Sequence, residues 1–142
     1  MQKIEKILVP LDGSQCAEMV FPTVEKLAGD LKASAALLRV AYAHVIPGAD
    51  PIEAQVKVVR EAEDYLRDIE KQLTAKGLKV ETHVRYGQDA DEILDHAAQP
   101  DIDLIAMTTH GRSGIKRFLL GSVAEKVLRH SPKPIMLVRC GG

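Results

Sequence analysis

Glycines and hydroxyl side chains follow an apolar run near the end of the chain, at spacings suited to phosphate binding. Residues 103–107 form the run, Gly111 and Gly114 follow in a polar loop, and Gly121 and Ser122 stand where the next amphipathic segment begins. Glycine permits a positive φ and close approach of the backbone to a ligand, and the first N–H groups of a helix attract anions. This pattern predicts a phosphate site, for which a nucleotide is the natural ligand.

A purely structural interpretation fits the same residues. Ser122 and Glu125 match a capping box, in which the serine hydroxyl and the glutamate carboxylate satisfy the first-turn donors of the helix. The glycines would then belong to an ordinary flexible connection. Glycines in a loop do not by themselves decide between the two interpretations.

Four segments give the chain a family resemblance. They begin at Ile7 (ILVPLDGS), Met107 (MTTHGRSG), Gly121 (GSVAEKV) and Ser131 (SPKPIMLV). Together they resemble the universal stress protein family, and the resemblance covers essentially the whole of residues 1–142 as one domain.

The nucleotide motif of that family is matched in part. Nucleotide-binding members carry Gly-x2-Gly-x9-Gly-[Ser/Thr], and Gly111, Gly121 and Ser122 match its later positions, whereas Thr108 stands at the first glycine. The threonine either adds bulk where the family's backbone passes close to the nucleotide or lends it a hydroxyl. The resemblance implies that ATP, AMP or another adenine nucleotide binds, with Mg²⁺ able to accompany the phosphates.

Apolar periodicity predicts strands and helices in alternation. Strand-like runs cover residues 6–9, 35–40, 78–84, 103–107 and 135–138. Pro10 is expected to stop the first run, and the third should be an edge strand that turns Lys79, Glu81 and His83 outward. The last two runs are apolar enough for burial on both faces.

The helical stripes lie between these strands. One helix is expected from Ala17 to Leu31, a second carries an apolar stripe from Ile52 to Leu73 and ends at Gly77, and Asp89 begins a third. Strands joined by crossover helices predict an α/β fold, a doubly wound parallel sheet with helices on both faces. The resemblance implies the strand order 3-2-1-4-5, which brings residues 10–14 and 107–111 together across one crevice.

The resemblance also implies roles for single residues. Asp12, beside Pro10 and Leu11, would contact the adenosine unless it only starts the first helix, and Val40 would pack on adenine unless it is simply a core residue. Met107 and Thr108 would flank the ribose. The phosphate-binding residues would be Gly111, Gly114, Gly121, Ser122 and Val123.

Several charged or reactive side chains allow a simpler interpretation. Arg112, Lys116 and Arg117 would either add positive charge near the phosphates or remain solvated loop cations. His110 is expected to shape its loop rather than catalyse, since no carboxylate stands at a telling spacing. The other four histidines are scattered and form no metal-ligand pair at helical spacing.

Composition narrows the classes of function. The 142 residues are 46% hydrophobic and 27% charged with a net charge of −1, so no basic surplus indicates a nucleic-acid partner. No run approaches the length of a membrane span and no signal-peptide core is seen, so we expect a cytoplasmic protein. Cys16 and Cys140 form no Cys-x-x-Cys pair, so we expect no disulfide framework. Cys16 is expected to pack as a small hydrophobic residue.

No catalytic constellation accompanies the expected site, and the Walker signature is missing. Together with the resemblance, which implies an ATP-binding stress-response module, this leads us to expect a protein that works through assembly or partner contacts rather than catalysis. A dimeric interaction protein that has lost nucleotide binding, or a slow ATPase, are the alternatives. Residues from Ile135 to Val138 form an apolar edge strand in the implied order, which predicts a homodimer through antiparallel pairing of that strand.

Overall fold

Five parallel strands form one sheet in the order β3-β2-β1-β4-β5. The computed structural model describes residues 3–111 and 120–140. The strands are β1 (Lys6–Leu11), β2 (Ser34–Ala41), β3 (Val80–Tyr86), β4 (Leu104–Thr108) and β5 (Ile135–Val138). This arrangement confirms the predicted doubly wound α/β fold and its strand order.

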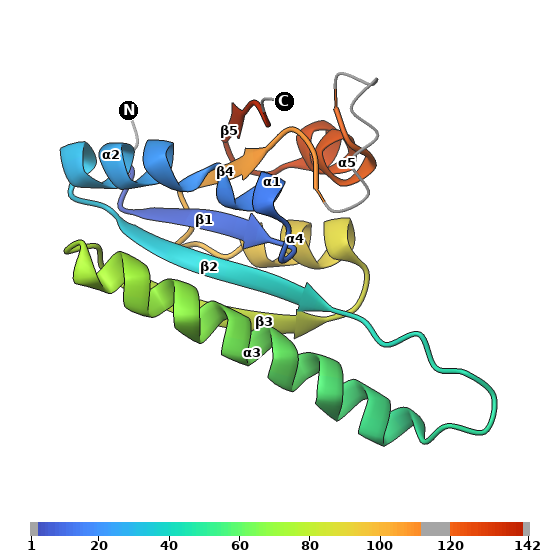
Figure 1. Ribbon diagram of the computed structural model, residues 1–142. Helices are drawn as coiled ribbons and strands as arrows, with labels where there is room; N and C mark the ends of the chain where they lie inside the picture. Colours follow the sequence, from blue (N-terminus) through green and yellow to red (C-terminus); the bar gives the residue numbers. More distant parts are fainter. Residues whose placement is uncertain (1–2, 112–119, 141–142) are drawn as a thin grey trace.

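Helices cover both faces of the sheet (Figure 1). They are α1 (Gln15–Glu18), α2 (Phe21–Leu31), α3 (Pro51–Ala75), α4 (Asp89–Ala97) and α5 (Ser122–His130). Helices α2 and α3 pack on one face, and α4 and α5 pack on the other. The central strands are therefore buried on both sides, which explains why their sequences are continuous apolar runs.

The helix expected from Ala17 to Leu31 is two helices. Helix α1 ends at Glu18 and α2 begins at Phe21, with Pro22 in the first turn of α2. Proline has no N–H and its ring would clash with the carbonyl of the residue four positions earlier, but it is tolerated in a first turn. Pro22 therefore accounts for the break.

Strand β1 does not stop at Pro10, contrary to the prediction. It pairs with β2 as far as Leu11 and Arg39, whereas its described pairing with β4 ends at Leu8 and Ile105. Pro10 lies beyond the ladder to β4, so its missing N–H removes no hydrogen bond on that side. The two central strands thus separate toward their carboxyl ends.

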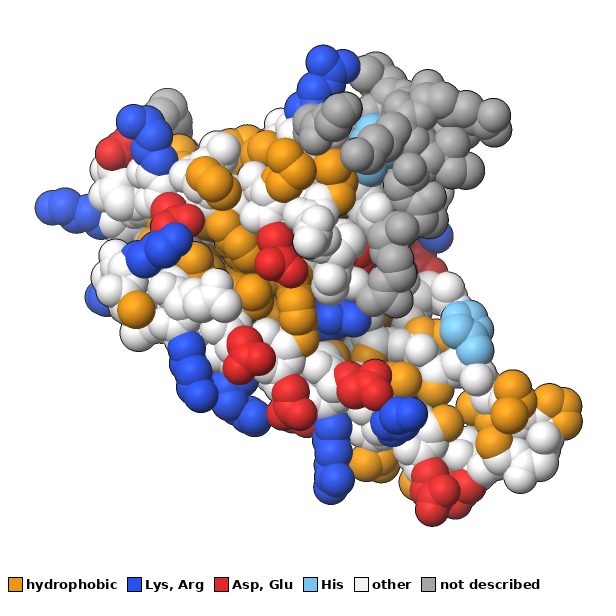
Figure 2. All heavy atoms as spheres, viewed as in Figure 1, with side chains coloured by type: hydrophobic (Ala, Val, Ile, Leu, Met, Phe, Trp, Pro, Cys, Tyr) orange, Lys and Arg blue, Asp and Glu red, His pale blue; other side chains and the backbone are white. Residues whose placement is uncertain are grey.

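Helix α3 extends well beyond the sheet. Asp50 caps its start by accepting a hydrogen bond from the Ile52 amide at 2.9 Å, and Gly77, with φ of +89°, follows its end. The predicted apolar stripe is buried from Ala62 onward, but Ile52 is 73% exposed. The first half of α3 and the loop before it therefore form a projecting arm, and Figure 2 shows hydrophobic side chains at its tip.

The polar side chains of β3 are only partly turned outward. Lys79 is exposed as expected, but Glu81 and His83 are half-buried on the face that carries α4. The Glu81 carboxylate accepts hydrogen bonds from His83 and from the Lys6 ammonium, both at 3.0 Å, and the His83 ring packs against His96. The alternation of apolar and polar side chains along β3 was predicted correctly. The prediction missed that α4 partly covers the face that carries the polar side chains.

Strand β5 is the other edge of the sheet. Its residues are half-buried, because β4 pairs with one side of the strand while no described residue pairs with the other. The prediction of burial on both faces was therefore too strong.

Within the described residues, no helix is long and apolar enough to cross a membrane.

Candidate functional site

A cavity of about 580 Å³ lies where β1 and β4 separate. The segments 10–12 and 107–111 face each other across it, at the carboxyl ends of the strands. Most of the predicted residues line it, namely Pro10, Leu11, Asp12, Val40, Met107, Thr108, Gly111, Gly121, Ser122 and Val123. Arg112 and Gly114, together with Lys116 and Arg117, lie outside the described residues.

Asp12 organises the turn after β1. Its Oδ1 atom accepts hydrogen bonds from the Ser14 amide at 2.9 Å and from the Ser14 hydroxyl at 2.5 Å. That hydroxyl in turn caps α1 by accepting from the Ala17 amide, while Gly13 takes a φ of +85° between them. Asp12 thus starts the first helix, as the structural interpretation expected, and it also lines the cavity.

Gly111 meets Asp12 across the cavity. A Cβ built on Gly111 would collide with the Oδ2 atom of Asp12. On the same wall, a Cβ on Gly121 would lie 3.3 Å from the Thr109 carbonyl oxygen and 3.4 Å from Cα of His110. At both glycines a side chain would fit only if its neighbours shifted, so the backbone itself borders the cavity here.

Helix α5 begins at the cavity without a side-chain cap. Gly121 is the N-cap residue, and the described residues provide no side-chain hydrogen bond to its first turn. The Glu125 carboxylate instead accepts a hydrogen bond from Arg129 at 3.1 Å, one turn further on. The capping box of Ser122 and Glu125 is therefore not formed, and among the described residues no hydrogen-bond acceptor occupies the Ser122 and Val123 amides, which are N–H groups of the kind that bind anions.

Thr108 and His110 shape the loop after β4. The Thr108 hydroxyl is buried and donates to the His110 carbonyl oxygen at 2.8 Å. The His110 Nδ1 atom lies 2.9 Å from the Thr109 hydroxyl oxygen, within the same loop. Since the Thr108 proton is used inside the protein, its hydroxyl can offer a ligand only an acceptor.

The cavity also has walls that the sequence did not indicate. They include Arg39, Tyr42, His44, Glu61 and Asp89. Arg39 and Tyr42 flank the predicted Val40 at the end of β2, so their place in the chain was a usable signal. Glu61 comes from the middle of α3, and nothing in its local sequence distinguishes it from the other charged residues of that helix.

Arg39 is held in the cavity wall by aromatic packing. Its guanidinium lies 4.9 Å from the centre of the Tyr65 ring, a cation–π arrangement. The Tyr65 hydroxyl donates to the Glu18 carboxylate at 2.7 Å and thereby ties α3 to α1. Burial, followed by this hydrogen bond, raises the pKa of Tyr65 well above its usual value, so the hydroxyl stays a donor at neutral pH.

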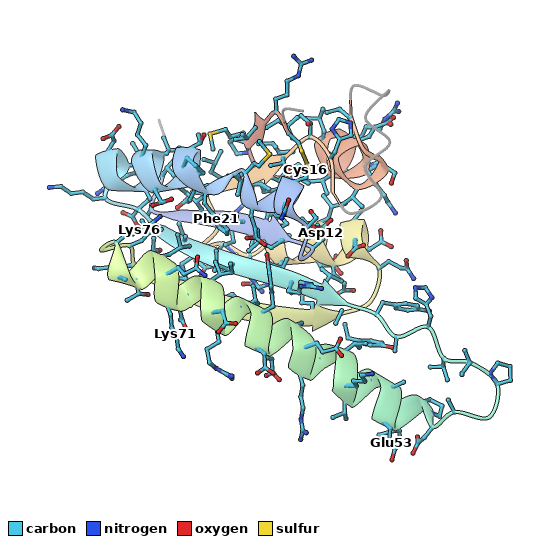
Figure 3. The ribbon with its side chains drawn as sticks, in the orientation of Figure 1. Asp12, Cys16, Phe21, Glu53, Lys71 and Lys76 are labelled. Atoms are coloured by element: carbon cyan, nitrogen blue, oxygen red, sulfur yellow. A yellow bond between two sulfur atoms is a disulfide. The ribbon has the colours of Figure 1, made fainter. Side chains whose placement is uncertain are left out.

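The cysteines overturn an expectation from the sequence. Cys16 and Cys140 form a disulfide, with their Cα atoms 5.5 Å apart and a sequence separation of 124. Figure 3 shows the bond at α1, the short helix that follows the turn carrying Asp12. Spacing along the chain could not show this pairing, because it arises only when β5 places the end of the chain beside α1.

A buried histidine lies away from the cavity. His96 in α4 accepts a hydrogen bond at Nδ1 from Arg85 at 2.9 Å, and its ring centre is 4.7 Å from that of His83. Burial, then the charges of His83 and Arg85, lower the pKa of His96 to about 4.

Among the described residues no group of three or more His, Cys, Asp or Glu side chains could hold a metal ion.

Known proteins with similar sequences and structures span the same length. A universal stress protein of Methanothermobacter thermautotrophicus is 35% identical over 146 residues, covering 98% of each chain. The solved structure of protein MJ0577, from Methanocaldococcus jannaschii, superposes with a TM-score of 0.88 at 31% identity and covers 99% of each chain.

Two more distant solved structures share the fold. A universal stress protein in complex with cAMP has a TM-score of 0.76 at 19% identity, covering 99% of this chain and 100% of that one. An Arabidopsis thaliana family protein with AMP bound has a TM-score of 0.64 at 15% identity, covering 95% and 91%. The model of the universal stress protein family matches residues 3–139. The chain therefore belongs to the universal stress protein family.

Proposed function

We propose that this protein binds an adenine nucleotide, with ATP as the first candidate, in the cavity between β1 and β4. The observation that carries the proposal is the start of α5, where a helix without a side-chain cap opens onto a cavity of about 580 Å³ beside Gly111. That volume suits a nucleotide-sized ligand, and the first-turn N–H groups of α5 suit its phosphates.

The two ends of the cavity favour the two ends of a nucleotide. Ser122 and Val123 provide backbone donors and one hydroxyl for the phosphates, and Gly121 leaves room for them while its own N–H is bonded to the Thr109 carbonyl oxygen; any accompanying Mg²⁺ would bind through phosphate oxygens. Asp12 and Val40 line the cavity on its β1 and β2 side, where a carboxylate can accept from a ribose hydroxyl and an apolar side chain can pack on adenine. Relatives described with cAMP and with AMP support an adenine ligand.

We also propose how binding is used. The cavity joins loops from opposite halves of the chain, so a ligand there can change how the surface around it meets a partner without any chemistry on the nucleotide. Residues 1–142 would act as one cytoplasmic domain in the response to stress. Two copies would pair through β5, whose outer side is open among the described residues.

Calorimetry with ATP and Mg²⁺ tests nucleotide binding directly. We expect a dissociation constant on the order of micromolar, as for a site built mainly from backbone donors, and a raised melting temperature with ligand. Gly121→Val should abolish both effects, because its branched side chain would fill the space beside Thr109 and His110. Gly29→Val is the matched control, since nothing lies within 4 Å of that position.

The result also separates the alternatives. Absence of heat with the parent protein at millimolar ATP, together with an unchanged melting temperature, would exclude the proposed site. It would favour a dimeric interaction protein without a nucleotide. Equal ATP binding by Gly121→Val and the parent would mean that the phosphate site has been misplaced.

A further inference from the structure

The disulfide joins helix α1 to the segment that follows β5. Cys16 lies in α1, directly after the turn that holds Asp12, and Cys140 follows the end of β5. Cys16 is half-buried and Cys140 is buried, so a small thiol reaches the bond more readily at Cys16. The chain has two cysteines, and both are used in this bond.

On the β1 side, short steps connect Cys16 to the cavity. The neighbouring Ala17 lines the cavity, and its amide donates to the Ser14 hydroxyl, which donates to Asp12. The Sγ atom of Cys16 also lies 3.1 Å from the carbonyl oxygen of His110, across the crevice. A movement of α1 would therefore shift both Asp12 and the His110 carbonyl.

On the β4 side, Cys140 is connected to the predicted phosphate loop. Its amide donates to the Thr109 hydroxyl at 3.2 Å, and the Thr109 carbonyl accepts from the Gly121 amide at 2.7 Å. Gly121 is the N-cap of α5. The covalent bond thus holds together the groups on the two sides of the cavity that the ligand must contact at the same time.

We propose that Cys16 and Cys140 form a reversible redox site that controls the nucleotide cavity, an inference that rests on the proposed function. Oxidation uses a low-molecular-weight disulfide such as glutathione disulfide. The Cys16 thiolate attacks it, forms a mixed disulfide and releases one glutathione thiolate. The Cys140 thiolate then displaces the second glutathione, so the protein loses two electrons and two protons and the small disulfide gains them.

The oxidised form is the tighter binder. With the bond closed, the Asp12 turn and the Thr109 loop are held at the spacing that the cavity requires, so less ordering is needed when the ligand enters. With the bond open, α1 and the end of the chain move independently. Coupling between sites is reciprocal, so bound nucleotide must favour the disulfide by the same factor as the disulfide favours the nucleotide.

Calorimetry in glutathione buffers of known ratio tests the coupling, with thiol alkylation and mass spectrometry to count free thiols. We expect oxidised protein to bind ATP at least about fivefold more tightly than reduced protein. Saturating ATP should shift the glutathione ratio at half-oxidation by the same factor. A double variant, Cys16→Ser with Cys140→Ser, should bind ATP equally in both buffers, as the reduced parent does.

Several outcomes would overturn the inference. Equal ATP affinity in both states would exclude redox control while leaving nucleotide binding intact. No ATP binding in either state would exclude the proposed function, and the coupling with it, whereas alkylation would still report whether the disulfide exchanges. A disulfide that resists every glutathione ratio, or a reduced protein that has lost its far-ultraviolet circular dichroism, would identify a permanent structural bond instead.

Discussion

Asp12 and Gly111 approach each other so closely that a single methyl group on Gly111 would collide with the Asp12 carboxylate. The carboxylate cannot simply turn away, because its other oxygen is held by the amide and hydroxyl of Ser14. The pair therefore sets the width of the cavity between the β1 turn and the β4 loop.

Gly111→Ala should consequently weaken ATP binding by about tenfold or more, which corresponds to about 1.4 kcal/mol. The added Cβ must displace either Asp12 or the loop, while the sheet below keeps its packing. Calorimetry with ATP and Mg²⁺ gives the affinity. Gly29→Ala adds the same group in open space and serves as the control, and equal affinity of Gly111→Ala and parent would show that the ligand does not use this narrow point.

Thr108 should act on the loop rather than on the ligand as a donor. Thr108→Val keeps the shape of the side chain but leaves the His110 carbonyl without its 2.8 Å hydrogen bond. We expect a loss of about 1 to 2 kcal/mol in the free energy of unfolding, measured in urea. Thr108→Ser retains the hydroxyl and should recover most of the loss, and a failure to do so would assign the effect to the methyl group.

Thr108→Gly separates the two roles considered for this residue. If the side chain obstructs the nucleotide, its removal tightens ATP binding despite the lower stability. If the hydroxyl oxygen contacts the ligand, ATP affinity falls with Gly and is retained with Ser. Because the hydroxyl already supports the loop, we expect weaker ATP binding in Thr108→Gly.

His96 should make stability depend on pH. Its pKa is about 4 in the folded protein, against about 6.5 in an unfolded chain, so between these values the unfolded chain binds a proton that the folded one does not. The contribution of His96 to the free energy of unfolding is therefore fully present above about pH 6.5. It is lost as the pH drops toward 4, and the loss is at most on the order of 3 kcal/mol.

Urea unfolding at neutral pH and at about pH 5 measures this slope. Glu81, His83, Arg85 and Asp101 also carry charge near the ring, so the test is the difference between parent and His96→Gln. The amide oxygen of glutamine can still accept from Arg85, and the slope should become shallower. His130→Gln, at an exposed histidine, should leave the slope unchanged. Parallel slopes for His96→Gln and parent would contradict the assignment.

Strand β5 allows a dimer test that spares the fold. The carbonyl oxygens of Pro134 and Val138 accept hydrogen bonds from the β4 side, so the alternate residue Leu137 directs its N–H toward the open edge. Leu137→Pro should give a monomer that remains folded, whereas Met136→Pro should also disturb the ladder to β4. Sedimentation equilibrium should show about twice the 15.5 kDa chain mass for the parent and a single chain mass for Leu137→Pro. A parent that stays monomeric at tens of micromolar would refute pairing through β5.

Apolar periodicity located all five strands and most of the helices, because burial on one or both faces leaves a repeat in the sequence. The resemblance supplied the strand order, which local pattern does not contain. Two prolines were harder to interpret. Pro10 lies within β1 because a neighbouring ladder ends before it, and Pro22 divides a helix whose apolar spacing reads as continuous.

The candidate site was predictable where it lies on strand ends and glycine loops. Asp12, Gly111 and Gly121 carry a local signal, since each follows a strand or starts a helix. Glu61 and the disulfide carry none, because they depend on how distant elements pack. Ile52 is the opposite case. It belongs to the apolar stripe of α3 and was therefore expected to be buried, but that part of the helix lies beyond the sheet and the residue is exposed.

The bond between Cys16 and Cys140 also makes most of the polypeptide a closed covalent ring, since it spans 124 positions. The loop between β2 and α3, which belongs to the projecting arm, offers a protease an accessible stretch of backbone, since Ile46 there is 70% exposed. A cut there would open the ring without releasing a fragment. The nicked molecule would consist of two polypeptides joined by the disulfide, with new ends on the arm, and the two would migrate together in a denaturing gel until a reductant separated them.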